Sequence, residues 1–553
     1  MKKNPLIWLA GKIRCRIPMV VLLTAINIVH ALLGVFFALG SRGVIDSAVS
    51  GDKSRFLHAC TIQAIIILGI LLCLALMRHL QERLRADLER DWKKNLLHGL
   101  LHGEYAAIKE YHSAELLNRM NNDVTKVNDG ILSIAPSAAA MVTKVGAAIV
   151  VLGILDLRFT VLILAVGLLV FSITGFMRQK LKELNKTVST QDGKVSGFLQ
   201  EIVEKMLMVQ AMDVSGEVES RADTLMEARY QIQRKRKNVS LMTNMGVSIF
   251  SYGAGFIALI WGANRLLQGQ ISFGSLTAII QLVNQIKSPF VNLSGIFPLY
   301  IAMMSSAERL MELDSIQGEP VPCCEDPRIL YQKATGISAI DLSFAYDRES
   351  VLRNTEFVLP KGVFAVITGP SGIGKSTLLK LMLGIFQPET GRICLNCGEE
   401  NLHLDRSTRK LFAYVPQGNL LLSGTLRDNL TIVKPDATEE EFQQAIFVSN
   451  MEEVISALPE GLDTILGESG SGLSEGQAQR LAIARAVLGG APILLLDECT
   501  SALDEETEKI VLHRLRNLSD RTCIAVTHRS AAMEVCDWKL ELQNGKIKAT
   551  QIK

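Results

Sequence analysis

Long apolar runs dominate the first 304 residues of this 553-residue chain and limit what it can fold into. Each run is long enough to cross a hydrocarbon layer about 30 Å thick as a helix. After about residue 336 such runs stop, and short strands, helices and glycine-rich turns follow. We therefore predict an α-helical membrane domain with six transmembrane helices, followed by a soluble α/β domain. The six runs are Pro18–Leu39, Phe56–Met77, Ile131–Leu155, Phe159–Phe176, Val239–Ala263 and Phe273–Met304.

Basic residues divide the connections between these runs into two classes. The short connections, 40–55, 156–158 and 264–272, contain five Lys and Arg residues in all, whereas the long connections, 78–130 and 177–238, contain 21. The positive-inside rule then predicts a multi-pass protein of the cell membrane, in contact with lipid, whose long connections and two termini lie in the cytoplasm. Apolar residues recur in the long connections at helical spacing, so the spans are predicted to continue as helices beyond the bilayer.

The domain boundaries follow from these patterns. Residues 1–304 are assigned to the membrane domain and 336–553 to the soluble domain, and the proline- and glycine-containing stretch 305–335 is assigned to a linker. The chain has 58 basic and 56 acidic residues, a formal net charge of +2. Because a nucleic-acid-binding protein normally has a strong basic excess, we predict no nucleic-acid partner.

The strongest motif lies near the start of the soluble domain. It reads Gly-Pro-Ser-Gly-Ile-Gly-Lys-Ser-Thr and stands between an apolar strand, Phe364–Thr368, and a helix, Leu378–Leu383, as a P-loop requires. The glycines let backbone N–H groups curl around phosphate oxygens, Lys375 faces the phosphates with a positive charge, and the Ser376 hydroxyl can reach Mg²⁺. The predicted phosphate-binding residues are Gly369, Ser371, Gly372, Gly374, Lys375, Ser376 and Thr377.

A second motif, Ile-Leu-Leu-Leu-Asp-Glu, begins at Ile493. Its four apolar residues predict a buried parallel strand, and Asp497 and Glu498 follow at the end where open α/β sheets bind ligands. Asp497 suits Mg²⁺ coordination, and Glu498 is placed to polarise an attacking water. Alone, the two carboxylates could be solvated surface charge; together with the P-loop they favour catalysis.

The segment Leu473–Gln477, Leu-Ser-Glu-Gly-Gln, precedes a predicted helix and resembles the signature motif of ATP-binding cassette (ABC) ATPases. The segments Leu422–Leu430 and Gly467–Gly470 resemble the exporter form of the cassette. With six spans before the cassette, the chain resembles half-transporters of the multidrug, lipid and peptide exporter type, often called type IV. The remaining family elements match Tyr346 (adenine stacking), Gln417 (Q-loop), Asp504 (D-loop) and His528 (switch histidine).

This resemblance implies ATP and Mg²⁺ as cofactors and a head-to-tail pair of cassettes. ATP would lie between the P-loop of one subunit and the signature motif of the other. One cassette and six spans therefore imply a second half-transporter, and the sequence leaves a homodimer and a heterodimer open. The resemblance assigns catalysis to Glu498 as base, His528 and Gln417, the metal to Ser376, Gln417 and Asp497, and the nucleotide's other side to Ser474, Gly476, Gln477 and Asp504.

The family's long helices end in short coupling helices that contact the cassettes. We expect these near Glu104–Glu110 and near Met208–Val214, the second docking on the opposite subunit's cassette. One residue departs from the family: the third signature position, usually Gly, is Glu475. Its carboxylate could weaken the closed state near the γ-phosphate, or its side chain could point away; we favour the second interpretation.

The predicted function is ATP-driven export of an unidentified substrate. Import through the same fold and an ATPase-regulated channel or sensor stay open as alternatives. The six runs contain no Asp or Glu, but they contain His30, Lys144 and Lys287. A charge at mid-membrane depth normally faces a cavity or a partner, so these residues suggest a substrate with an acidic or electron-rich group. The other interpretation is that the lysines snorkel to the membrane surface.

Overall fold

The computed structural model describes residues 4–316, 318, 326–346, 349–398, 400–418, 421–467, 472–518 and 521–553, apart from side chains within 166–182, 247–251 and 288–297 and that of Glu400. Two compact units divide the chain. Unit 1 comprises Met1–His98 and Ser113–Ser315, and unit 2 comprises Gly99–His112 and Ile316–Lys553. Each unit therefore contains segments that are distant in sequence.

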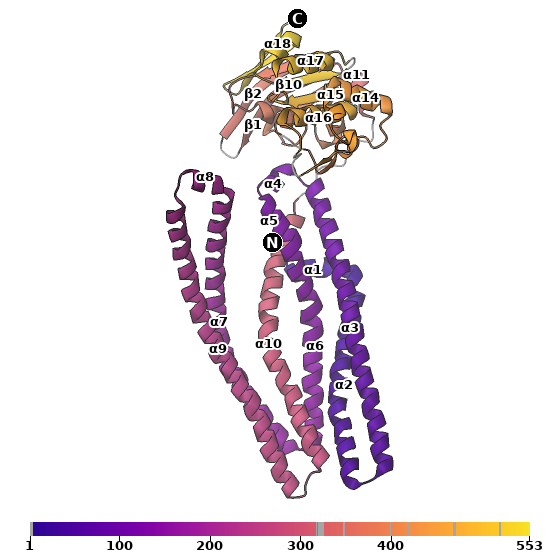
Figure 1. Ribbon diagram of the computed structural model, residues 1–553, viewed down its shortest axis with the longest axis vertical. Helices are drawn as coiled ribbons and strands as arrows, with labels where there is room; N and C mark the ends of the chain where they lie inside the picture. The colour runs from indigo at the N-terminus through magenta and orange to yellow at the C-terminus, as the bar shows by residue number, and fades with distance from the viewer. Residues whose placement is uncertain are drawn as a thin grey trace. The chain divides into compact units, whose positions relative to one another are not determined.

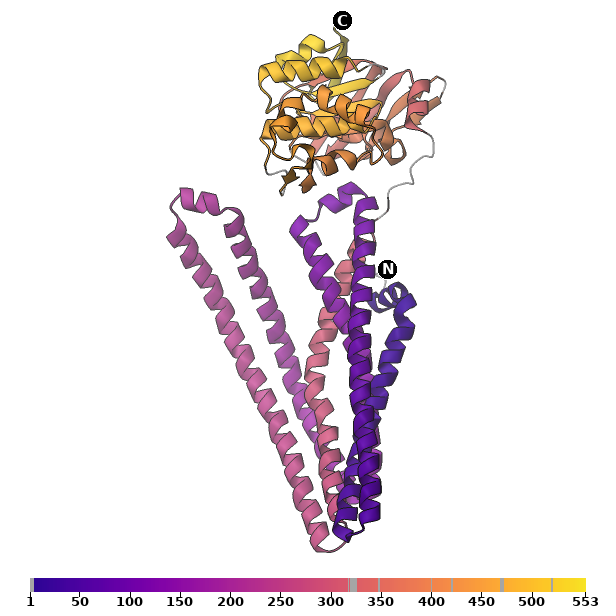
Figure 2. The ribbon, with the colours of Figure 1, turned by 45° about the vertical axis from the view of Figure 1, so that its right-hand side comes forward.

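Unit 1 is built from helices alone within the described residues (Figures 1 and 2). Helices α7 and α9 lie side by side along their length, and the short helix α8 joins them (Figure 1). The helices are α1 (Pro5–Lys12), α2 (Ile17–Ser50), α3 (Lys53–His102), α5 (Ser113–Asn118), α6 (Val124–Leu155), α7 (Leu157–Glu204), α8 (Met206–Ala211), α9 (Ser215–Leu267) and α10 (Phe273–Asp314), with a 3₁₀ turn at Arg14–Arg16 and a π-helical turn at Arg119–Asp123.

The long helices extend well past the length of a membrane span. Helix α9 has 53 residues, about 80 Å at 1.5 Å per residue, against a hydrocarbon core of about 30 Å. In the described residues, the stretches Arg14–Ser50, Lys53–His102 and Ser113–Leu155 are long and apolar enough to cross a membrane. The other three predicted spans fall on α7, α9 and α10, where part of each lies outside the described side chains.

Small residues allow the helices of unit 1 to approach closely. Ala38, Ala148 and Ala258, from α2, α6 and α9, are fully buried in one cluster with Leu152 and Leu282. Lipid tails are as apolar as these side chains, so helix packing in a membrane depends on such close van der Waals contact. Many large apolar side chains of α2, α3 and α6 are instead exposed, as expected for surfaces that face lipid.

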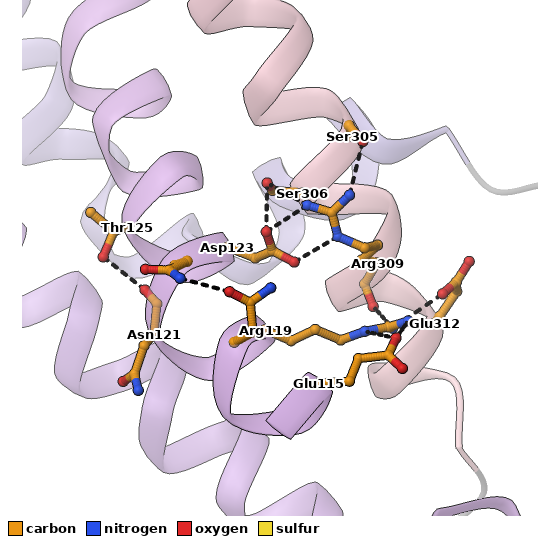
Figure 3. A network of polar contacts seen from close by, with 11 residues as sticks. Glu115, Arg119, Asn121, Asp123, Thr125, Ser305, Ser306, Arg309 and Glu312 are labelled. Carbon is orange, nitrogen blue, oxygen red and sulfur yellow. Dashed lines mark hydrogen bonds and ion pairs between the residues drawn. The ribbon is translucent and has the colours of Figure 1, made fainter. Parts of the chain in front are cut away.

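Ion pairs tie the start of α6 to the end of α10 (Figure 3). Asp123 is fully buried and accepts hydrogen bonds from Arg309 Nη2 at 2.6 Å, Arg309 Nε at 2.7 Å and the Ser306 hydroxyl at 2.9 Å. Arg119 donates to the backbone carbonyl of Arg309 at 2.7 Å and pairs with Glu115 and Glu312. We call this group of residues the α6–α10 clamp.

A second set of polar contacts holds α1 against α10 and α3. The Trp8 indole and the Lys12 ammonium both donate to Asp314, at 2.9 and 2.5 Å. Trp8 also contacts Trp92 of α3, with ring centroids 5.4 Å apart. The end of α10 is thus held from two sides, by α1 and by the α6–α10 clamp.

Unit 2 contains two main sheets. One is antiparallel with the order β2-β1-β4-β5, the other has the order β12-β11-β3-β10-β9-β6, and a small pair joins β7 to β8. The strands are β1 (Gly336–Tyr346), β2 (Glu349–Pro360), β3 (Phe364–Thr368), β4 (Thr390–Cys397), β5 (Glu400–His403), β6 (Phe412–Val415), β7 (Gly424–Thr425), β8 (Ile465–Leu466), β9 (Ile493–Asp497), β10 (Thr522–Val526), β11 (Trp538–Gln543) and β12 (Lys546–Gln551).

The helices of unit 2 pack against these sheets and bury two apolar clusters, one containing Phe364 and Leu481 and the other Phe357 and Leu378. Strands β9 and β10, which are apolar except for Asp497 and Thr522, are buried at every residue, as the sequence pattern of a central parallel strand predicts. The helices are α4 (Tyr105–Lys109), α11 (Pro327–Lys333), α12 (Lys375–Met382), α13 (Leu426–Thr431), α14 (Glu439–Val448), α15 (Glu452–Ala457), α16 (Glu475–Leu488), α17 (Glu505–Arg516) and α18 (Ser530–Val535).

The stretch predicted as linker, 305–335, contains more helix than its Pro and Gly residues suggested. Helix α10 continues to Asp314, and α11 begins at Pro327, whose fixed φ suits the first turn of a helix. Residues 317 and 319–325, between them, lie outside the described residues. Short helices are also present at the two expected coupling segments: α4 in the first, and α8, which begins slightly earlier than expected, in the second.

Candidate nucleotide-binding site

Glycines shape the loop between β3 and α12. Gly369, Gly372 and Gly374 have φ angles of 148°, 76° and 109°, which side chains with a Cβ rarely adopt. A Cβ on Gly369 would lie 2.5 Å from the Leu542 carbonyl oxygen, and one on Gly374 would lie 2.1 Å from Val351 Cγ1. The loop therefore requires glycine for two reasons, backbone conformation and close packing. Such a loop at a helix N-terminus fits a phosphate group.

Lys375 begins α12 and is buried beneath this loop. Its ammonium donates to the backbone carbonyls of Gly369 and Pro370, each at 3.0 Å. Thr377 is also buried, whereas Ser371 is exposed at the tip of the loop. The predicted P-loop residues thus form one loop, with Lys375 held so that its charge faces the loop interior.

Strands β3, β10 and β9 are parallel neighbours, so their carboxyl ends meet at one edge of the sheet. At this edge the Ser376 hydroxyl donates to Asp497 Oδ1 at 2.9 Å, and the Tyr414 hydroxyl of β6 donates to Asp497 Oδ2 at 3.0 Å. Burial raises the pKa of Asp497, although the hydrogen bonds from Ser376 and Tyr414 oppose that rise. Serine and carboxylate oxygens are the ligands that Mg²⁺ prefers, so this pair fits the metal.

Glu498 follows Asp497 and has a left-handed backbone, with φ of 48°. This conformation is unusual for a residue with a side chain, and such outliers cluster at functional sites. Gln417 Nε2 donates to Glu498 Oε2 at 2.7 Å, and His528 Nε2 lies 3.9 Å from Glu498 Oε1. The three residues predicted to act in catalysis are therefore together. Gln417 contacts Glu498 here, rather than the Ser376–Asp497 pair with which it was predicted to hold the metal.

Tyr346 ends β1 beside the P-loop helix. Its ring packs edge-to-face against Phe344 and Phe386, with centroids 5.0 and 5.4 Å away. Its hydroxyl lies 3.2 Å from Thr377 Oγ1. The ring is thus fixed by two aromatic neighbours and one hydrogen bond, which gives a base a firm surface to stack on.

Helix α4 belongs to the same unit and lies against this aromatic group. Tyr105 packs edge-to-face on Phe386 with centroids 6.1 Å apart, and the Lys109 ammonium lies 5.4 Å from the centre of the Tyr346 ring. The segment expected to couple the membrane domain to ATP hydrolysis therefore contacts the tyrosine expected to bind adenine.

The signature segment begins α16. Ser474 is the N-cap: its hydroxyl accepts from the Gln477 N–H, and the Gln477 side chain accepts from the Ser474 N–H at 2.9 Å. A Cβ on Gly476 would lie 2.8 Å from the Ala502 carbonyl oxygen, so glycine is required for packing there. Within the described part of the chain, no hydrogen bond or ion pair joins Ser474 to the P-loop. Both Ser474 and Glu475 are exposed.

The predicted D-loop connects this segment to the edge that carries Glu498. Gln479 of α16 donates to the Ser501 hydroxyl at 3.0 Å and accepts from the Ala502 N–H at 3.1 Å. Asp504 caps α17 by accepting from the Thr507 N–H at 2.9 Å. Sequence reasoning assigned Asp504 to the nucleotide and did not find Gln479, although Gln479 is two residues beyond the signature motif.

Comparisons with known proteins identify the family of this chain. The family model of the ABC transporter transmembrane region matches residues 20–290, and the ABC transporter model matches 352–501. The chain belongs to the ABC transporter family. It is an ATP-hydrolysing, multi-pass membrane transporter whose ATPase and membrane domains are fused in one chain.

Two relatives and one solved structure give the extent of the similarity. A probable ABC transporter ATP-binding/permease protein of Haemophilus influenzae is 28% identical over 80% of this chain and 80% of its own length. An ATP-dependent lipid A-core flippase of Idiomarina loihiensis is 28% identical over 79% of this chain and 75% of its own. A bacterial Atm1-family ABC exporter, solved with ATP bound, has the same fold, with a TM-score of 0.80, 22% identity and coverage of 98% and 95% of the two chains.

Replacement of Tyr346 tests its predicted role in this transporter. Because stacking requires only a π face, Tyr346→Phe and Tyr346→Trp are expected to keep ATP affinity, whereas Tyr346→Ala should lose about 1–3 kcal/mol, or roughly 5- to 150-fold. Equilibrium binding of a fluorescent ATP analogue would measure this. Equal loss in the Phe and Ala variants would instead assign the role to the hydroxyl and its contact with Thr377.

Proposed function

We propose that this chain is one subunit of a dimeric exporter of the cell membrane, which hydrolyses ATP to move a substrate out of the cytoplasm. The observation that carries the proposal is the meeting of the P-loop, the Ser376–Asp497 pair and Glu498 at one edge of the sheet. This edge has a phosphate cradle, oxygen ligands for a metal and a carboxylate base, which are the parts that phosphoryl transfer to water requires.

Each residue has a separate task in this proposal. The P-loop and Lys375 bind the phosphates, and Tyr346 stacks on adenine. Ser376 and Asp497 would hold Mg²⁺, which neutralises phosphate charge when bound. Glu498 accepts a proton from the attacking water, and His528 contacts the γ-phosphate.

Gln417 links the base to its surroundings through its 2.7 Å hydrogen bond to Glu498. The amide oxygen of the same side chain would join Ser376 and Asp497 in holding Mg²⁺, and Glu498 would then be free to accept a proton from the water. A hydrogen bond that occupies Glu498 until nucleotide and metal are bound would keep the site from hydrolysing ATP before it is fully assembled.

A second subunit would complete the site. The 14-residue helix α16 begins with the exposed N-cap Ser474 and the half-buried Gly476 and Gln477, and such a helix N-terminus suits contact with an anion on another molecule. This arrangement supports a head-to-tail dimer with Asp504 close to the same interface. Both a pair of identical chains and a pair of related chains fit these observations.

Export and orientation are supported by further observations. One relative is named as an ATP-dependent lipid A-core flippase, and the solved structure that shares the fold is named as an exporter. The distribution of basic residues supports cytoplasmic termini and a cytoplasmic position for α4 and α8.

Transport into sealed vesicles tests the proposal. Inside-out membrane vesicles that contain the full chain should accumulate substrate when ATP and Mg²⁺ are added, and should not do so with a non-hydrolysable ATP analogue. ATP-dependent loss of substrate preloaded into such vesicles would favour import. Conductance without matching ATP consumption would favour a channel. Activity of the purified chain alone would support a homodimer, and activity that requires a second subunit would support a heterodimer.

Glu475 provides a further test of the signature segment. Its side chain is exposed in the first turn of α16, where a negative charge stabilises the helix by about 0.3–1 kcal/mol. Glu475→Gln is therefore expected to leave the ATPase rate within about twofold of wild type, the usual range for a surface substitution. An increase well beyond this range would show that the carboxylate weakens the closed dimer.

A further inference from the structure

Helix α10 has a polar face at the depth of the membrane. Leu282, Val283 and Ile286 are buried in the core of unit 1. On the side away from that core, Asn284 is exposed. Because each residue of a helix is turned by about 100° from the one before it, three half-buried polar residues lie within about 100° of Asn284 around the helix axis. These three residues are Gln281, Gln285 and Lys287.

Other helices add polar groups at the same level. Gln285 Nε2 donates to the Gly34 carbonyl of α2 at 2.6 Å, and His30 lies one turn before Gly34. The side chains of His30 and of Lys144, from α6, are close enough to interact electrostatically. On the other side, the Lys287 ammonium approaches α9 at Gly255, where a Cβ would lie 3.6 Å from it.

The basic residues lie far along their helices from the short connections. Lys144 is 11 residues from the end of α6 at Leu155, and Lys287 is 14 residues from the start of α10 at Phe273, or about 16 and 21 Å at 1.5 Å per residue. The hydrocarbon core is about 30 Å thick. The six predicted spans contain no Asp or Glu, so a bound anion would bring negative charge to this level of the membrane domain.

Two glutamine side chains on this face have an unsatisfied amide oxygen. Among the described residues, Gln281 Oε1 and Gln285 Oε1 are buried without a hydrogen bond. Buried polar atoms in a membrane are normally satisfied by neighbouring helices or by a ligand. These two acceptors suit a hydroxyl or amide donor on a bound molecule.

We propose that the face formed by Lys144, His30, Lys287 and the α10 amides binds the anionic head group of an amphipathic substrate. The head group is a carboxylate or phosphate that also carries a hydrogen-bond donor, and the substrate's apolar part lies among the surrounding aliphatic residues. This inference rests on the proposed function and names the class of substrate that the exporter would carry.

Matched amphiphiles test the proposal on the full chain in phosphatidylcholine vesicles. N-dodecanoylglycine is compared with its uncharged amide and with dodecyltrimethylammonium, and dodecyl phosphate separates phosphate from carboxylate recognition. The anions are expected to stimulate ATP hydrolysis with half-maximal concentrations about tenfold or more below that of the amide, because charge-assisted hydrogen bonds form only with the anion.

Variants of the two lysines locate the effect. The double variant Lys144→Gln/Lys287→Gln should lose the preference for anions, whereas the double variant Lys144→Arg/Lys287→Arg should retain that preference. Lys53→Gln, the same change at an exposed residue outside the predicted spans, should behave as wild type.

The outcomes separate this inference from the function on which it rests. A wild-type protein that does not hydrolyse ATP would contradict the proposed function. Normal basal hydrolysis with equal responses to anion, amide and cation would overturn the inference alone. A preference for anions that survives in the double Gln variant would also overturn it, because the lysines would then reach the membrane surface instead. If the double Gln variant fails to fold, the preference of the wild-type protein and of the double Arg variant for anions still tests the inference.

Discussion

Glu498→Gln is expected to lower ATP hydrolysis by about 100-fold or more while ATP binding persists, because a positioned general base typically contributes about 10²–10⁴ to the rate. Glutamine keeps the shape of the side chain and can still accept the hydrogen bond from Gln417. The phosphate cradle is separate from the base and should remain intact. The variant should therefore accumulate as an ATP-bound closed dimer, measured by retained nucleotide and by a cross-link between cassettes.

Two variants serve as comparisons for this prediction. Lys375→Ala removes the charge that faces the phosphates and should weaken ATP binding by about 1.5–3 kcal/mol, or about 10- to 150-fold. Glu506→Gln makes the same Glu-to-Gln change at an exposed residue of α17 and should hydrolyse ATP normally. Near-normal turnover by Glu498→Gln would show that another group is the base.

The central part of the nucleotide site could be predicted from the sequence because its chemistry is local. The glycines and Lys375 of the P-loop all lie within nine residues. The strand that precedes the two carboxylates can be recognised from its continuous apolar run. The boundaries of β3 at Phe364 and Thr368 agree with the prediction, since the pattern of a buried strand is short and continuous. The membrane domain was recognisable for the same reason, since each span is one uninterrupted segment.

Contacts between distant segments could not be predicted in this way. Tyr414 holds Asp497, 83 residues later, through a hydroxyl that a strand pattern does not distinguish from a core tyrosine. Lys109 lies over Tyr346, although more than 200 residues separate them. Gln417 reaches Glu498, 81 residues later, through a side-chain contact that forms only once the fold is in place.

The α6–α10 clamp was missed for a similar reason. Asp123 and Arg309 are 186 residues apart, and each occurs in a helix rich in charges, where a solvated surface is the usual expectation. In the structure, the Arg119–Asp123 segment forms a π-helical turn, a local departure from regular helix that the sequence pattern did not predict. The turn widens the helix next to Asp123.

Arg309→Met is expected to destabilise unit 1 by about 3–5 kcal/mol, because removing one partner of a buried pair leaves an uncompensated charge. Asp123 is fully buried, so water cannot replace the lost arginine. In the variant its carboxylate would keep only the hydrogen bond from the Ser306 hydroxyl. Burial opposes ionisation of Asp123, and hydrogen bonds from Arg309 and Ser306 overcome it, so the pKa is lowered in the native protein. Thermal unfolding of the detergent-solubilised chain would measure the loss.

The pH dependence of this loss identifies its cause. In the native protein the pKa of Asp123 is lower than in the unfolded chain. Its carboxylate therefore stabilises the fold at pH values above the unfolded pKa, and this stabilisation is lost as the pH falls through the folded pKa. Without Arg309, burial would raise the pKa, and the proton taken up in mild acid would remove the buried charge. The difference in stability between wild type and Arg309→Met should therefore narrow as the pH is lowered.

A double variant separates buried charge from lost packing. Asp123→Leu/Arg309→Met should recover most of the stability, since apolar residues often replace a buried ion pair without cost. Arg55→Met, at an exposed pair with Asp52, should change stability by less than about 1 kcal/mol. The clamp joins the segments just after His112 and just before Ile316, where the chain passes between the two units. The stable double variant is therefore expected to hydrolyse ATP but to transport less per ATP; unchanged transport would show that the clamp only stabilises the helices.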